Sequence, residues 1–228
     1  MYKGMTASAF LTIAAFAMTS ALSGCGDSFD GNDSSKVNGS IHVAVGKPAG
    51  AVNTVNGSIH IDDNAAVTSA NTVNGSVHLG AHAAAASLNT VNGSITLDTG
   101  AHASGSASSV NGALTLHDGA EILGSLNNVN GKIDLTAAHV AGGIKTVNGN
   151  IDITGASHVE GGITVHKPGG SFLHFGNDVP RIVIGPGATV QGDLRFERTV
   201  KLFVSDKATI GPVTGATPIT FTGDNPPT

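Results

Sequence analysis

The tripeptide Val-Asn-Gly recurs seven times in this 228-residue chain, and its spacing constrains the fold more than any other feature. It begins at Val37, Val55, Val73, Val91, Val110, Val129 and Val147. The intervals are 18, 18, 18, 19, 19 and 18 residues, so one structural unit of nearly constant length is repeated. Such a unit is too short for a paired-helix repeat, which needs more than about 30 residues.

Apolar residues recur in fixed places within the unit. Each Val-Asn-Gly is followed by an apolar pair with one residue between, such as Ile59 and Ile61, and this alternation predicts a short strand with one buried face. A second apolar column precedes each repeated valine by three places, at Val52, Ala70, Leu88, Ala107, Leu126 and Ile144. A further column is expected at Pro48, Ala66, Ala84, Ala103, Ile122, Val140 and Val159.

These columns predict an all-β fold, a single-stranded parallel β-helix (β-solenoid) of about ten coils with an 18–19-residue repeat. Each coil would lie about 4.8 Å from the next, and the stack would bury a core that one coil cannot bury alone. A set of antiparallel hairpins with Asn-Gly turns is the second interpretation. The uniform period favours the solenoid.

Stacking would place the repeated asparagines directly above one another at a corner between two strands. The Asn-Gly pair is expected to adopt left-handed backbone conformations there, because these residues tolerate them. The side-chain amides would then hydrogen-bond along the column as a structural asparagine ladder of Asn38, Asn56, Asn74, Asn92, Asn111, Asn130 and Asn148.

Four segments follow from the pattern. Residues 1–24 are expected to be a signal peptide, 25–36 a lipidated cysteine with a flexible polar tether, and 37–165 the regular solenoid. Residues 166–228 are expected to continue the solenoid irregularly and to cap its end, as solenoid ends require. Five of the eight phenylalanines fall in this last segment: Phe172, Phe175, Phe196, Phe203 and Phe221.

The N-terminal segment has the features of a targeting signal. Lys3 precedes an apolar stretch that is too short to span a membrane, and the only cysteine, Cys25, ends the sequence Leu-Ser-Gly-Cys. This sequence resembles the lipobox of bacterial lipoproteins. The resemblance implies cleavage before Cys25, a diacylglyceryl thioether on its sulfur, an acylated N-terminus and a lipid anchor in the cell envelope, expected in the outer membrane.

The repeats also resemble two groups of β-helical proteins. The Ala-x-Val-x-Gly-x-Leu unit at Ala188–Leu194 looks like the coil motif of bactofilins, which are polymer-forming bacterial proteins. The Val-Asn-Gly-Ser-Ile-x-Ile units resemble the adhesin-like β-solenoids of bacterial envelopes. These resemblances imply a non-catalytic scaffold that binds partners, or other copies of itself, through flat faces or coil ends.

Polar columns are the remaining candidates for chemistry. One contains His42, His60 and His78, and a second contains His102, Glu121, His139 and His158. Either column could offer metal ligands, but parallel columns aim their side chains alike. The leading interpretation is therefore a solvated face with no metal and no cofactor. A periplasmic metal-binding protein using the first three histidines is one alternative.

Catalysis and nucleic-acid binding are not expected. The formal net charge of −5 gives no basic field for nucleic acid. Asp134 and Asp152 occupy neighbouring places, as paired acids do in polysaccharide-active enzymes. Residues 37–170 contain no Phe, Tyr or Trp to stack on a sugar, so a solubilising role is favoured and no catalytic residue is assigned. A polysaccharide-binding or polysaccharide-active β-helix remains the main alternative to a scaffold.

Overall fold

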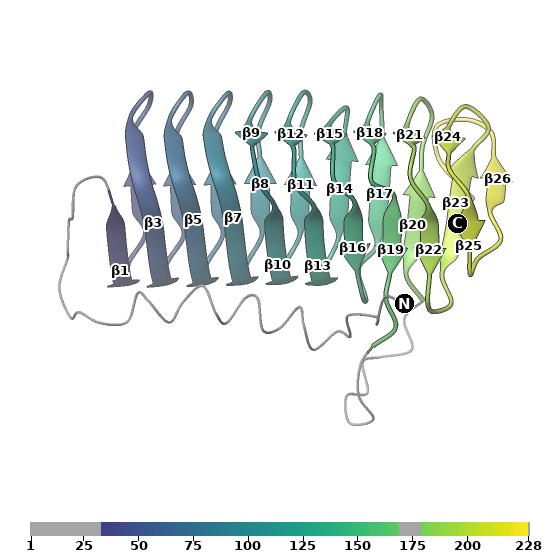
Figure 1. The fold of residues 1–228 in the computed structure, drawn as a ribbon, viewed down its shortest axis with the longest axis horizontal. Helices are drawn as coiled ribbons and strands as arrows, with labels where there is room; N and C mark the ends of the chain where they lie inside the picture. The colour runs from purple at the N-terminus through teal and green to yellow at the C-terminus, as the bar shows by residue number, and fades with distance from the viewer. Residues whose placement is uncertain (1–32, 169–178, 228) are drawn as a thin grey trace, which may run out of the picture.

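The chain folds into a β-solenoid whose coils stack along one axis (Figure 1). The computed structural model describes residues 33–168 and 179–227. Within these ranges the fold is all-β without any helix, and successive parallel strands lie about one repeat apart, which confirms the predicted fold class. The expected signal peptide, Cys25, Phe172 and Phe175 lie outside the described residues.

One side of the solenoid, here called sheet B, takes one short strand from each of ten coils. All neighbours in it are parallel. Its strands, in spatial order, are β2 (Ile41–Val43), β4 (Ile59–Ile61), β6 (Val77–Leu79), β8 (Ile95–Leu97), β11 (Leu114–Leu116), β14 (Ile133–Thr136), β17 (Ile151–Thr154), β20 (Arg181–Ile184), β23 (Lys201–Ser205) and β26 (Ile219–Phe221).

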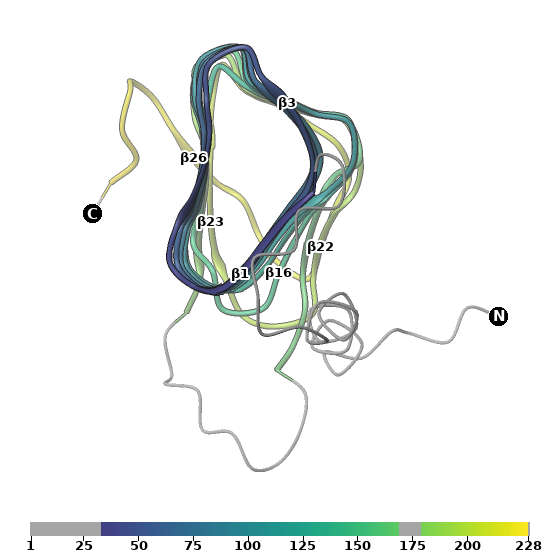
Figure 2. The same ribbon diagram turned by 90° about the vertical axis from the view of Figure 1, so that its left-hand side faces the viewer.

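The rest of each coil forms the sixteen-stranded sheet A, which bends around the core (Figure 2). In the first coils it uses β1 (Ser34–Asn38) and three long strands, β3 (Pro48–Asn56), β5 (Ala66–Asn74) and β7 (Ala84–Asn92). Each later coil contributes two shorter strands. They are β9 (His102–Ala103), β10 (Ala107–Asn111), β12 (Glu121–Ile122), β13 (Leu126–Asn130), β15 (His139–Val140), β16 (Ile144–Thr146), β18 (His158–Val159), β19 (Ile163–Val165), β21 (Thr189–Val190), β22 (Leu194–Phe196), β24 (Thr209–Ile210) and β25 (Val213–Thr214).

One inserted residue explains the change from one long strand to two. Ala85 pairs with Ala103 and Leu88 pairs with Ala107, so two residues lie between the paired positions in one coil and three in the next. The extra residue lies in Ser104–Ser106, where the strand breaks and a new corner forms. The first 19-residue interval therefore records a change in the outline of the coil.

The same insertion corrects one predicted column. Pro48, Ala66 and Ala84 stack on His102, not on Ala103, and Pro48 and Ala66 are exposed. Residues counted backwards from each Val-Asn-Gly cross the inserted residue in the coil of Ala103 and in the later coils, which displaces the expected column by one place. The inward column consists of Ala49, Val67, Ala85, Ala103, Ile122, Val140, Val159, Val190 and Ile210.

A polar column closes the core beside the Val-Asn-Gly corner. The Oγ1 atoms of Thr54, Thr72 and Thr90 donate hydrogen bonds of 2.8–3.0 Å to glycine carbonyls of the preceding coil, and Ser109 does the same. These side chains are buried, so the bonds satisfy groups that water cannot reach. The threonine or serine that precedes Val55, Val73, Val91 and Val110 thus has a structural role that the apolar columns did not suggest.

The repeated glycines are required mainly for close approach between coils, which corrects the left-handed backbone expected for Asn-Gly. Among the seven tripeptides only Gly39 and Gly131 have positive φ, 110° and 139°, and none of the asparagines does. At Gly75, a Cβ atom would lie 1.9 Å from the carbonyl oxygen of Gly57 in the preceding coil. Only glycine allows the coils to pack this closely at the corner.

The last coils differ from the others in where they place apolar side chains. Phe196 joins the main core, whereas Val183, Phe203 and Phe221 form a separate buried cluster. Val183 and Phe203 continue the column that carries Asp134 and Asp152 on the outer side of sheet B. Among the described residues, no helix is long and apolar enough to cross a membrane.

Candidate functional site

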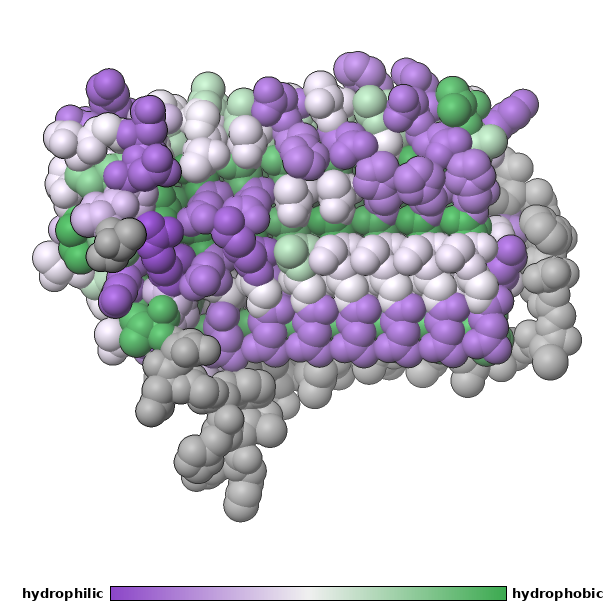
Figure 3. Space-filling model, turned by 180° about the vertical axis from the view of Figure 1, so that it is seen from behind, coloured by the Kyte–Doolittle hydropathy of each residue, from purple (hydrophilic) through white to green (hydrophobic). Residues whose placement is uncertain are grey.

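The outer surface of the solenoid carries side chains of similar polarity in rows along its axis (Figure 3). This follows from the parallel register, which places equivalent residues of successive coils side by side. Residues between two inward ones on a strand point outward, so each row is one position of the repeat. Two such rows contain clusters of histidine and carboxylate side chains.

The first cluster lies on sheet B and contains the predicted column of His42, His60 and His78. Their rings follow one another with centroids 5.7 and 4.5 Å apart. The Nδ1 atoms of His60 and His78 lie 3.1 Å apart. The sequence prediction of a stacked row is therefore correct, and the side chains aim alike, as parallel columns should.

Aspartates that follow the strands contact the Nε2 atoms of the histidines in this row. Asp62 Oδ1 lies 2.8 Å from Nε2 of His42 and 3.3 Å from Nε2 of His60, and Asp98 Oδ2 lies 2.8 Å from Nε2 of His78. The histidines are thus held separately by two carboxylates. They are not among the described groups in which three metal-ligand atoms converge.

The second cluster lies on sheet A, where β9, β12, β15 and β18 place His102, Glu121, His139 and His158 in one register column. Glu121 is shared by its two neighbours: Oε2 lies 2.9 Å from Nδ1 of His102, and Oε1 lies 2.9 Å from Nδ1 of His139. The first three members of the column therefore form a chain of alternating histidine and carboxylate contacts across adjacent coils.

These contacts shift the protonation of two members. The hydrogen bond with His139 lowers the pKa of the Glu121 carboxyl below its ordinary value, more than burial raises it. The hydrogen bond with Glu121 raises the pKa of His139, and Glu160 acts in the same direction. Each partner stabilises the charged form of the other.

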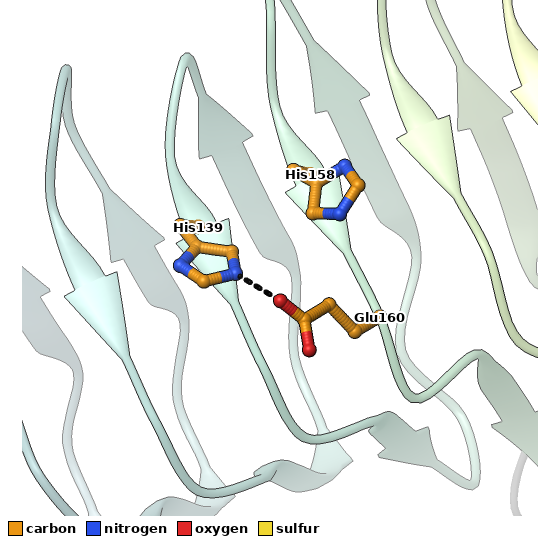
Figure 4. A group of neighbouring side chains, drawn as sticks. All are labelled: His139, His158 and Glu160. Carbon is orange, nitrogen blue, oxygen red and sulfur yellow. Dashed lines mark hydrogen bonds and ion pairs between the residues drawn. The ribbon is translucent and has the colours of Figure 1, made fainter.

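Glu160 also belongs to this cluster, and the sequence columns did not predict it. Its Oε1 atom lies 3.0 Å from Nε2 of His139. The signal was present in His158-Val159-Glu160, because Val159 points into the core and the residues on either side of it point outward. His139, His158 and Glu160 each offer one ligand atom, and these atoms lie within 4.8 Å of one another (Figure 4).

The predicted neighbours Asp134 and Asp152 are paired in register on sheet B. Lys132 Nζ lies 2.6 Å from Oδ1 of Asp134 and 2.8 Å from Oδ2 of Asp152, so one ammonium bridges both carboxylates. These hydrogen bonds, that of Asp134 first, raise the pKa of Lys132. The cation relieves the repulsion between two acids on adjacent strands.

Asparagine ladders run along the corner and along sheet A. In the predicted ladder, Nδ2 of each asparagine donates to Oδ1 of the one before it, at 2.8–2.9 Å over six links from Asn38 to Asn148. A second, shorter ladder joins Asn53, Asn71 and Asn89 at 2.8–2.9 Å. It was not predicted, although its residues recur two places before Val55, Val73 and Val91.

Comparisons with known proteins do not narrow the function. A scan against protein-family models gives no match, and searches of curated proteins and of solved structures give none either. The resemblances to bactofilins and to adhesin-like envelope proteins therefore stay predictions from the repeat motifs.

Proposed function

We propose that this protein is a non-catalytic, lipid-anchored scaffold of the bacterial cell envelope that assembles through the ends of its solenoid. The anchor is proposed from the sequence around Cys25, which lies outside the described residues. The scaffold role is supported by the unbroken stack of parallel coils. The observation that carries the proposal is the pair of strand edges at the two ends of that stack.

At each end, a strand of sheet B has a hydrogen-bonded neighbour on one side only, within the described part of the chain. β2 pairs with β4 alone, and β26 pairs with β23 alone. Unpaired edges of this kind accept further strands. Because the two edges belong to the same parallel sheet, the first coil of one copy can continue the last coil of another, giving an open head-to-tail assembly.

The lateral faces are less suited to strand-like association. Along the corner, the asparagine amides are already hydrogen-bonded to each other from coil to coil. The backbone groups of inner strands bond to the coils on either side. Polar groups that are satisfied within the rod gain little from a new partner. We therefore place self-association at the ends, and leave the faces for partners of other kinds.

The backbone of His42 provides a test. Ile41 N donates to Ser58 O and Val43 O accepts from Asp62 N, so both residues bond toward the second coil. Since bonding direction alternates along a parallel strand, the N–H of His42 points toward the open edge. His42→Pro removes that donor, which an edge strand tolerates. His42→Ala removes the same imidazole and keeps the donor.

Sedimentation velocity of the full chain in detergent, over a range of concentrations, provides the measurement. We expect the wild type and His42→Ala to form larger species as concentration rises, and His42→Pro to stay at lower mass with the same circular dichroism. A wild-type chain that stays monomeric throughout would contradict end-on assembly. Equal assembly by both variants would contradict the assigned edge.

A further inference from the structure

Among the described residues, His139, His158 and Glu160 form the one group of three metal-ligating side chains whose ligand atoms converge. His139 and His158 lie side by side on β15 and β18, and Glu160 extends from the segment after β18 toward the same space (Figure 4). The two rings are 5.6 Å apart between centroids and tilted by 40°. His42 and His60 have a similar spacing and tilt, 5.7 Å and 37°, so the distinguishing feature is Glu160, which lies two residues after His158 and brings a carboxylate beside the ring of His139.

The distances suit a metal ion after a small adjustment. One ligand atom from each residue lies within 4.8 Å of the other two. In a tetrahedral site with bonds of about 2.1 Å, ligand atoms are about 3.4 Å apart. His139 Nε2 and Glu160 Oε1 are already 3.0 Å apart, so the remaining movement falls on side chains that are partly or fully exposed.

The surroundings of His139 match those of histidines that bind metals. Its Nδ1 atom contacts Glu121 Oε1 at 2.9 Å, on the opposite side of the ring from Glu160. A carboxylate that accepts the Nδ1 hydrogen orients the ring and leaves the lone pair of Nε2 for an ion. Glu121 is itself held in place by His102 Nδ1 at 2.9 Å.

We propose that His139, His158 and Glu160 bind one divalent transition-metal ion of the zinc class, with Glu121 orienting His139 through its other ring nitrogen. Two imidazoles and one carboxylate are a common set of three protein ligands for Zn²⁺, and the exposed side of the group leaves a fourth position for water. Mg²⁺ and Ca²⁺ prefer oxygen ligands, so the two nitrogens select against them.

This proposal is independent of end-on assembly and replaces the histidine row of sheet B as the candidate metal site. In that row the three Nε2 atoms contact Asp62 or Asp98, the Nδ1 atoms of His60 and His78 contact each other, and the described residues show no convergence of three ligand atoms there. The experiment can therefore compare two histidine clusters within one chain.

Calorimetric titration with Zn²⁺ tests the site. The protein is the full chain carrying Cys25→Ser, so that no thiol competes for the ion. We expect one ion per chain. His158→Ala should weaken binding by more than about 100-fold, and Glu121→Gln by about 10- to 100-fold, as for other groups that orient a ligand. Substitution by Co²⁺ should give visible absorption that His158→Ala abolishes.

Two matched variants complete the design. His117→Ala removes an exposed histidine outside both clusters and should leave the affinity unchanged. His60→Ala removes the central histidine of the sheet B row and should also leave it unchanged. The proposal is overturned if the parent chain shows no saturable Zn²⁺ binding, if His158→Ala binds like the parent, or if His60→Ala abolishes binding.

Discussion

Asn128 Nδ2 donates a hydrogen bond of 2.9 Å to the carbonyl oxygen of Gly112, in the place where Thr90 bonds Gly75 two coils earlier. The two side chains bond the carbonyl oxygen at the same position of the repeat, but asparagine carries a second polar atom that also needs a partner. Asn128 is buried, and its Oδ1 atom has no hydrogen-bond partner. Threonine at this place leaves no such oxygen.

Asn128→Thr should therefore stabilise the protein. The hydroxyl can keep the bond to Gly112, while the unpaired buried oxygen, which costs about 1–3 kcal/mol, is removed. We expect the free energy of unfolding to rise by about 1 kcal/mol, measured as a shift of the urea midpoint. Asn127→Thr, at the adjacent outward position, should not stabilise. A lower midpoint for Asn128→Thr would show that Oδ1 is not a cost.

The middle of the asparagine ladder should contribute more than its end. Asn74 makes two side-chain bonds, to Asn56 and from Asn92, whereas Asn38 makes one, from Asn56. With a net value of about 0.5–1.5 kcal/mol per bond, Asn74→Ala should lose about 1–3 kcal/mol and Asn38→Ala about half of that. Urea denaturation measures both, and equal losses would argue against a ladder of independent links.

Close packing of the coils predicts a large effect at Gly75. In Gly75→Ala the new Cβ would meet the Gly57 carbonyl oxygen at 1.9 Å, and the nearest atoms are all backbone of the preceding coil, which cannot shift easily. We expect a loss of about 3 kcal/mol or more, at the upper end of the usual cost of overpacking.

Gly46→Ala is the matched control for that substitution. Gly46 has open space around the Cβ position but a φ of +65°, so its loss reports backbone conformation alone, at about 1 kcal/mol. Thermal unfolding followed by circular dichroism compares the two variants. A milder effect at Gly75 than at Gly46 would contradict the assigned role of the repeated glycine.

The contact between Glu121 and His139 should make stability depend on pH. The lowered pKa of Glu121 means that its contribution is present above its ordinary value of 4.5 and is lost as pH falls through the folded-state pKa. The raised pKa of His139 means that its contribution is complete below 6.5 and is lost as pH rises through the folded-state pKa. The pair contributes most between these values.

Glu121→Gln should therefore lower the melting temperature most at about pH 4.5–6.5. The loss in free energy of unfolding should be no more than about 1 kcal/mol, as for other exposed ion pairs. The variant keeps His158 and Glu160, which face His139, and it keeps His102, which contacts residue 121. The measurement is thermal unfolding from pH 3 to 9 with a chelator present. Asp118→Asn removes an exposed carboxylate of the same coil. Its melting temperature should not show a particular loss between about pH 4.5 and 6.5.

The repeat was sufficient to predict the solenoid, its parallel register and the asparagine column, because each depends only on spacing. The position of the inserted residue at Ser104–Ser106 was not predictable, since intervals counted between tripeptides do not say where within a coil the extra residue lies. That uncertainty displaced one apolar column by one place.

The candidate site was predicted in part for a similar reason. Spacing brought His102, Glu121, His139 and His158 into one column, as the register shows. It did not show that His139 and His158 are tilted, or that Glu160 reaches the ring of the preceding coil. Convergence of side chains depends on their rotamers, which a repeat period does not specify.

The register between β3, β5 and β7 pairs each residue with the one 18 places later over nearly the whole strand. A segment of 18 residues in this region therefore begins and ends at equivalent positions of two adjacent coils, whichever residue it begins with. Duplicating or excising such a segment rejoins the ends without altering the outline of the coil, so the length of the solenoid can change in steps of one coil.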